Sequence, residues 1–165
     1  MATKLHTITI TRTFNAPREL VWKMFTDPKH LKNWYSPKGF TTPDCKVDFR
    51  VGGKTLISMQ SPELNQGKKV FSTGTYKEIK PMDRIVVTDS FADEKGNIVP
   101  AEHYGMTPGF PLELKVTMLF EDVKSKTKFT LIHEGHPAGE MFEGAKQGWA
   151  QMFDKLDEYL AKAKK

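Results

Sequence analysis

The sequence has a single cysteine, Cys45, and only four arginines among its 25 basic residues. One cysteine excludes an intramolecular disulfide framework and a multi-cysteine zinc site, so a reducing, cytoplasmic setting is expected. No apolar run approaches the roughly 18 residues that a membrane span needs, and the alternating threonines near the N-terminus are unlike a secretory signal. The scarcity of arginine argues against a nucleic-acid partner, because such sites favour arginine forks in a tight basic stripe.

Several enzyme signatures are also absent. The chain has no phosphate-binding P-loop, no dinucleotide-binding G-x-G-x-x-G and no G-x-S-x-G elbow. His133-Glu134-Gly135-His136 differs from the His-Glu-x-x-His zinc motif because its histidines are three residues apart rather than four. We therefore predict no metal, no cofactor and no catalytic residue. Cys45 lies in an alternating segment, which favours a small buried side chain over a nucleophile.

What the sequence does contain is typical of a globular protein. Its 165 residues include 38% hydrophobic residues and 18 aromatics, and this length fits one domain, residues 1–165. The net charge is +5, and residues 29–80 alone hold ten Lys or Arg against four Asp or Glu. A solvated, lysine-rich surface is the simplest interpretation of that local excess.

Hydrophobic periodicity predicts the order of the elements. Apolar and polar residues alternate in seven segments, which are predicted strands: 5–14, 45–49, 54–60, 69–79, 84–92, 112–121 and 129–133. Two short helices are expected after the first strand, one capped by Asn15 and one opened by Asp27-Pro28. The segment 141–163 has one apolar stripe at helical spacing. Short turns make the strands antiparallel, so we predict an α+β fold with the long helix on one face.

Six stretches of the sequence, taken in order, are similar to one known family. They are Phe14–Trp22, Phe25–Trp34, Asp48–Gly53, Gly74–Pro81, Thr127–His133, and Gly148-Trp149 ahead of Met152–Leu156. The chain resembles the activator-of-heat-shock-protein-90-ATPase-like group of the SRPBCC superfamily, also called START-like or birch-pollen-allergen-like. The resemblance implies a helix-grip fold, in which a curved seven-stranded antiparallel sheet wraps around the C-terminal helix. It also implies a cavity between helix and sheet for an apolar or amphipathic small molecule.

Two polar residues, Asp89 and His133, fall on inward positions of predicted strands. A polar group that faces an apolar interior needs a partner or water, and a ligand cavity would supply one. The alternative is a β-bulge that turns either residue outward. With the apolar inward positions, the predicted cavity lining is Trp34, Met59, Asp89, Phe91, His133, Trp149, Met152 and Phe153. Simple core packing is the alternative for the helix residues.

A long loop over residues 98–111 holds three prolines and two glycines. Its larger side chains are predicted to lie at the cavity mouth, as a flap or as a packing lid: His103, Tyr104, Met106 and Phe110.

Three functions remain open at this point. The first is binding of a hydrophobic small molecule, which needs a closed apolar cavity. The second is a chaperone-contact module, which needs an exposed patch, plausibly within residues 29–80. The third is a cyclase- or aromatase-type enzyme, which needs two convergent titratable groups in the cavity. In the eukaryotic activator a second, N-terminal domain does much of the chaperone binding, and 165 residues leave no room for it. We therefore rank small-molecule binding first.

Overall fold

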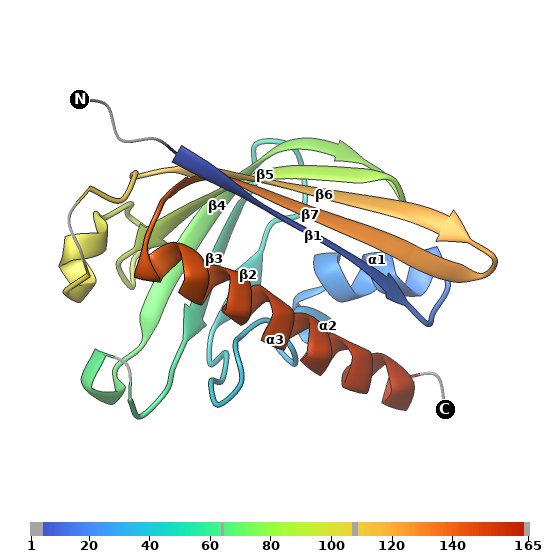
Figure 1. Cartoon of the computed structure of the whole chain (residues 1–165), viewed down its shortest axis with the longest axis horizontal. Coiled ribbons are helices and arrows are strands. Elements are labelled where there is room, and N and C mark those ends of the chain that lie inside the picture. The colour runs from blue at the N-terminus through green and yellow to red at the C-terminus, as the bar shows by residue number, and fades with distance from the viewer. Residues whose placement is uncertain (1–4, 64, 107–108, 164–165) are drawn as a thin grey trace.

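One antiparallel sheet and three α-helices make up the computed structural model, which describes residues 5–63, 65–106 and 109–163 (Figure 1). The strand order is β1-β7-β6-β5-β4-β3-β2. The elements, with η for short 3-10 helices, are β1 (Leu5–Phe14), α1 (Arg18–Thr26), α2 (Pro28–Leu31), β2 (Cys45–Val47), β3 (Lys54–Met59), η1 (Asn65–Gly67), β4 (Val70–Lys80), β5 (Arg84–Ala92), η2 (Ala101–Tyr104), β6 (Leu114–Val123), β7 (Lys126–Pro137) and α3 (Glu140–Ala163). This arrangement confirms the predicted α+β helix-grip fold.

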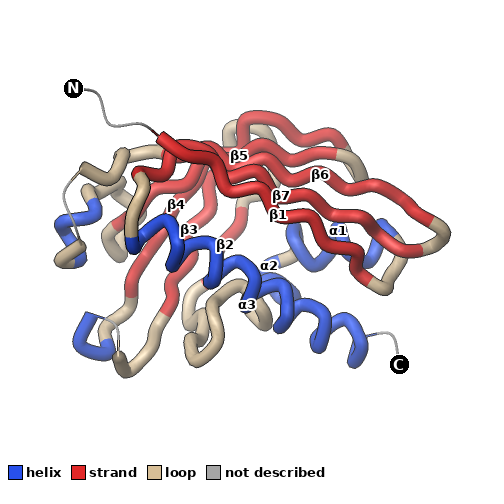
Figure 2. The backbone as a smooth tube through the Cα atoms, viewed as in Figure 1, coloured by secondary structure: helices blue, strands red, loops and turns tan. Residues whose placement is uncertain are grey.

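The sheet is strongly curved, and all three α-helices pack on one face. In Figure 2, β3 and β4 run at a steep angle to β1 and β7, and α3 crosses the concave side that this bend creates. α3 packs against β1 and β7, α1 against β6 and β7, and α2 against β2. No helix in the described part of the chain is long and apolar enough to cross a membrane.

Aromatic rings fill the space between α1, the C-terminal half of α3 and the sheet. Phe129 of β7 lies at the centre, fully buried, and its ring contacts those of Phe14, Phe25, Phe120 and Phe153 at centroid distances of 4.6–6.0 Å. Offset and edge-to-face contacts of this kind stabilise a core beyond simple area burial. This half of the interior is therefore closely packed.

The start of the first short helix differs from the prediction. The Asn15 cap was wrong, because α1 begins at Arg18 with Pro17 at the N-cap and no side-chain capping bond. The Ala16 amide donates to the Phe14 carbonyl at 2.9 Å, so the chain bends tightly before the helix and moves the cap two residues on. The second start is as expected: Asp27 accepts a hydrogen bond from the Lys29 amide at 2.9 Å, with Pro28 in the first turn.

Strand ends also shift. β6 begins at Leu114, and Leu112, predicted inside the strand, is 56% exposed. The predicted irregular loop contains η2, which is closed by left-handed Gly105 (φ 77°). β7 runs four residues beyond His133, to Pro137.

Candidate functional site

A cavity of about 210 Å³ lies between the N-terminal half of α3, strands β3–β5 and the loop after α2. Aromatic and other apolar side chains form most of its wall, and three polar residues complete it. Its lining is Tyr35, Pro37, Met59, Val70, Ser72, Asp89, Phe91, His133, Gly144, Ala145, Gly148, Trp149 and Met152. The cavity therefore combines an apolar body with a small polar region.

Small residues on α3 create this space. A Cβ atom built on Gly144 would meet nothing within 4 Å, and one on Gly148 would meet Pro37 Cγ at 3.5 Å. Ala145, between them, also faces the cavity. Glycine inside a helix costs up to about 1 kcal/mol relative to alanine, so two of them in one turn weaken the helix. What they provide here is room between the helix and the sheet.

A second, smaller cavity of about 40 Å³ lies deeper, toward α2 and β6. It shares Tyr35, Ser72 and Asp89 with the larger one, so these three residues stand between the two spaces. The pKa of Tyr35 is raised above its ordinary value, mainly because the phenol is buried and to a smaller extent because the negative charge of Asp89 is nearby. Tyr35 therefore keeps its phenolic proton and remains a hydrogen-bond donor.

The polar region is organised around the ring of His133. Trp149 Nε1 donates a hydrogen bond to His133 Nδ1 at 3.0 Å. An indole N–H can only donate, so His133 Nδ1 must accept and the ring proton is assigned to Nε2. His136 Nε2 lies 3.0 Å from the same Nδ1 atom, so it too must carry its proton and donate. His133 Nδ1 is therefore the acceptor at the centre of this cluster.

Asp89 is the accessible member of the cluster. Its Oδ2 lies 3.0 Å from His133 Nε2, yet the N–H is not aimed at the oxygen, and the buried Nε2 has no hydrogen-bond partner among the described residues. The His133 side chain is 5% exposed and that of Asp89 is 39% exposed. The two atoms are therefore close together without forming a hydrogen bond. The carboxylate of Asp89 is therefore the more accessible of these two polar groups.

A β-bulge brings His136 into this cluster. In the β1–β7 pairing His6 faces His136 and Thr7 faces Glu134, so Gly135 is an extra residue, and its φ is 104°. Without the bulge, residues 133 and 136 would point to opposite faces of the sheet. Both are buried. The pKa of His136 is lowered to about 4, mainly because the ring is buried and to a smaller extent because His133 is close to it. Within the described ranges no group of three His, Cys, Asp or Glu side chains could hold a metal ion.

The loop that closes the cavity is held by Lys155 of α3. Its Nζ donates to the Ser36 carbonyl and hydroxyl at 2.9 Å each, and to the Phe40 carbonyl at 3.2 Å. The Lys38 amide donates to Gln151 Oε1 at 3.1 Å. Burial lowers the pKa of Lys155 below its ordinary value. The loop is thus tied to the helix at several points around Pro37.

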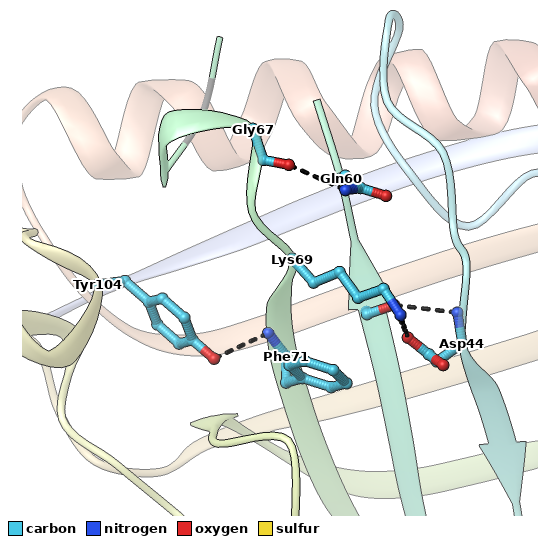
Figure 3. Close-up of polar contacts among 7 residues, drawn as sticks. Asp44, Gln60, Gly67, Lys69, Phe71 and Tyr104 are labelled. Carbon is cyan, nitrogen blue, oxygen red and sulfur yellow. Dashed lines mark hydrogen bonds and ion pairs between the residues drawn. The ribbon is translucent and has the colours of Figure 1, made fainter. Parts of the chain in front are cut away.

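Polar contacts also hold the opposite wall, where Met59 of β3 pairs with Val70 of β4. Figure 3 shows Lys69 Nζ, which lies 2.9 Å from Asp44 Oδ2, and Gln60 Nε2, which donates to the Gly67 carbonyl at 2.9 Å. The Tyr104 hydroxyl accepts from the Phe71 amide at 3.1 Å and donates to the Ala92 carbonyl. These bonds fix the strand ends that carry Met59 and Val70.

The structure brings together six of the eight residues predicted to line the cavity. The six that line it are Met59, Asp89, Phe91, His133, Trp149 and Met152. Trp34 and Phe153 lie instead in the closed core, both fully buried. Trp34 Nε1 donates to the Met24 carbonyl at 3.0 Å, and the Phe153 ring stacks on that of Trp149. Tyr35, Ser72, the small residues of α3 and, in the polar cluster, His136 were not predicted.

The loop residues predicted at the mouth do not line the cavity directly. Tyr104 and Phe110 pack behind Phe91, with ring centroids 6.0 and 5.7 Å away, and Phe110 also contacts His136 at 5.8 Å. His103 is exposed and Met106 is partly buried. The described part of the loop therefore supports the wall from behind.

Comparisons with known proteins agree with this architecture. Residues 15–161 match the protein family described as "Activator of Hsp90 ATPase homolog 1-like protein". A protein from Nitrosomonas europaea has a similar solved structure, with 26% identity, a TM-score of 0.75 and 96% of each chain covered. A protein from Chromobacterium violaceum is 29% identical, with a TM-score of 0.73 over 92% of this chain and 94% of that one.

The AHSA1 protein from Silicibacter pomeroyi shares the fold, with 20% identity and a TM-score of 0.70 over 94% of this chain and 98% of that one. The comparison with curated proteins gives no match.

Proposed function

Since the chain belongs to the family of Activator of Hsp90 ATPase homolog 1-like proteins, we propose that it binds a small hydrophobic or amphipathic molecule in the cavity between α3 and the sheet. The observation that carries the proposal is the cavity itself, with aromatic and methionine side chains around an accessible carboxylate. Small-molecule sites are commonly built this way, from an apolar wall and a few polar groups that orient the ligand. We place this activity in a single cytoplasmic helix-grip domain.

The volume of the cavity limits what it holds. Sites for drug-sized ligands begin at about 300 Å³, whereas an apolar cavity of about 150 Å³ accommodates benzene. At about 210 Å³, the cavity suits one aromatic ring with a short substituent. A sterol or a long fatty acid would need α3 or the loop to move away from the sheet.

We expect one-ring aromatic compounds to stabilise the folded protein in a saturable manner. A ligand at a hundredfold excess over its Kd contributes about 2.7 kcal/mol to the free energy of unfolding. Thermal unfolding of the purified protein with a panel of such compounds measures this. Tryptophan fluorescence should change with the same midpoint, because Trp149 lines the cavity. Native mass spectrometry would detect a molecule retained from the cell.

A cavity-filling variant makes the test specific. Ala145→Leu adds three carbon atoms at the cavity wall and should abolish the ligand-dependent shift. Ala163→Leu makes the same change at an exposed position of the same helix and should bind as the wild type does. A shift that persists in Ala145→Leu would mean that the compounds bind elsewhere, and the proposal would fail.

Catalysis is not part of this proposal. Asp89 and His133 do converge in the cavity, but His133 Nδ1 already accepts from Trp149, and Nε2 is buried against Asp89. Nδ1 is therefore not free to accept a proton from a bound molecule.

The family's description favours a second candidate, contact with an Hsp90-type chaperone. The local excess of positive charge over residues 29–80 would supply the contact. Exposed charges of this kind mainly accelerate association and are screened at physiological salt. We expect less than about a twofold stimulation of a purified chaperone's ATPase rate at 0.15 M salt. Strong, saturable stimulation that persists in Ala145→Leu would put this function ahead of ligand binding.

A further inference from the structure

The larger cavity carries one formal negative charge and no balancing positive one. Of the residues that the structure describes, Asp89 is the only Asp, Glu, Lys or Arg that lines it, and no Lys or Arg lines the smaller cavity beside it. Among the described residues, His133 Nε2 is the only ion-pair contact of Asp89, and no hydrogen bond to either carboxylate oxygen is formed. The Asp89 side chain is 39% exposed, so its carboxylate is accessible to a ligand and can form a charge-assisted hydrogen bond with a cationic donor.

The neighbouring histidines do not form a hydrogen bond with this carboxylate. Trp149 Nε1 donates to His133 Nδ1, so Nδ1 itself cannot carry a proton while this hydrogen bond is formed. His136 is also buried, and its Nε2 lies within hydrogen-bond distance of the same His133 Nδ1 atom. The Trp149–His133–His136 contacts thus all converge on His133 Nδ1, and neither histidine ring forms a hydrogen bond to Asp89.

The other groups around Asp89 suit a positively charged ligand. Tyr35, Phe91 and Trp149 contribute aromatic rings to the same wall. Aromatic faces attract cations through their quadrupole, most strongly where water is excluded. Ser72 also lines both cavities, and its hydroxyl oxygen is a further acceptor.

We infer that the bound molecule is a small arylalkylamine, whose protonated alkyl nitrogen pairs with Asp89 while its aromatic ring occupies the apolar part of the cavity. This inference rests on the proposed function and specifies the ligand class. A charge-assisted hydrogen bond in a partly buried site is worth about a tenfold gain in affinity or more. His133 Nε2 lies 3.0 Å from Asp89 Oδ2 without a hydrogen bond between them, so the carboxylate oxygens remain available to the amine.

Three probes of nearly equal size test the inference: benzylamine, benzyl alcohol and toluene. Benzylamine carries a positive charge at pH 7 and donates hydrogen bonds. Benzyl alcohol is uncharged but has a hydroxyl donor, and toluene has neither a charge nor a donor. Titration calorimetry and amide NMR shifts with the purified wild-type protein should give benzylamine a Kd at least about tenfold below those of both others. Asp89→Asn keeps the shape of the side chain and removes its charge. It should weaken benzylamine about tenfold or more and change toluene by less than about threefold.

Asp122→Asn is the matched control, because it removes one carboxylate from the exposed end of β6, outside both cavities. Its affinities should equal those of the wild type. Tighter binding of toluene or benzyl alcohol than of benzylamine, or an unchanged benzylamine affinity in Asp89→Asn, would overturn this inference and leave cavity binding intact. If none of the probes binds the wild type, the proposed function fails, and the inference fails with it.

Discussion

Replacing Trp149 by alanine should lower the free energy of unfolding by about 3 kcal/mol, as a denaturant melt would measure. The indole is 7% exposed, stacks on Phe153 and contacts Tyr35 edge-on at 5.9 Å. Removing a buried tryptophan usually costs about 3–5 kcal/mol. One side of this ring already borders the cavity, so fewer packing contacts are lost and the lower end of the range applies. The variant also removes one of the two donors to His133 Nδ1.

Two further variants separate packing from the hydrogen bond. Trp149→Phe keeps most of the ring but removes the N–H, and should cost about 1–2 kcal/mol. Gln147→Ala, at an exposed position two residues away on the same helix, should stay within about 0.5 kcal/mol of the wild type. A loss below about 0.5 kcal/mol in Trp149→Ala would contradict the buried position of this side chain.

The sheet and the long helix follow from local patterns that leave little choice. Ile8 and Phe14 are buried on the side of β1 that the alternation predicts, and Trp149, Met152 and Phe153 are buried along one stripe of α3. A strand or helix with one apolar face must cover that face, so periodicity and short turns together determine the layers. The predicted cap at Asn15 failed because the position of an N-cap depends on the local backbone bend before the helix, which hydrophobic periodicity does not predict.

The site depends on features that periodicity does not contain. An inward stripe cannot distinguish a residue in a closed core, such as Phe153, from one at a cavity wall, such as Met152, because that depends on which residues lie opposite. One signal was available: Gly144 and Gly148 weaken a helix without a role in packing, and such positions often make room for something else. They indicate the N-terminal half of α3 as the place where the interior opens.

His136 is the residue that sequence analysis missed most completely. In a regular strand, residues three apart point to opposite faces, so His133 and His136 were not expected together. Gly135 between them was the clue, since a glycine inside a strand often marks a bulge. Its left-handed φ and the skipped register opposite His6 and Thr7 turn His136 inward. A cluster of three titratable groups thus results from one extra residue.

The burial of His136 should make the protein less stable as the pH falls from 6.5 to 4. The pKa of His136 is about 4 in the folded protein and about 6.5 in the unfolded chain. Between these values the unfolded chain binds a proton that the folded protein does not, so the free energy of unfolding decreases with falling pH. Above pH 6.5 and below pH 4 the two states bind equally at this site. The loss should reach about 2–3 kcal/mol between pH 7 and pH 4.5.

Comparison with His136→Gln isolates this contribution. Glutamine does not titrate, and its amide can still donate to His133 Nδ1, so the variant should lose about 2–3 kcal/mol less than the wild type over the same pH window. The lowered pKa of Asp44 acts equally in both proteins and cancels in the difference. Asp89 and His133, the charged and titratable groups closest to this ring, are also unchanged.

Denaturant melts at pH 7.0, 6.0, 5.0 and 4.5 give the two curves, and an NMR titration of the His136 ring checks its pKa directly in the wild type. Parallel curves, or a ring that titrates near 6.5, would show that His136 is not held neutral by burial behind the Asp89–His133 pair.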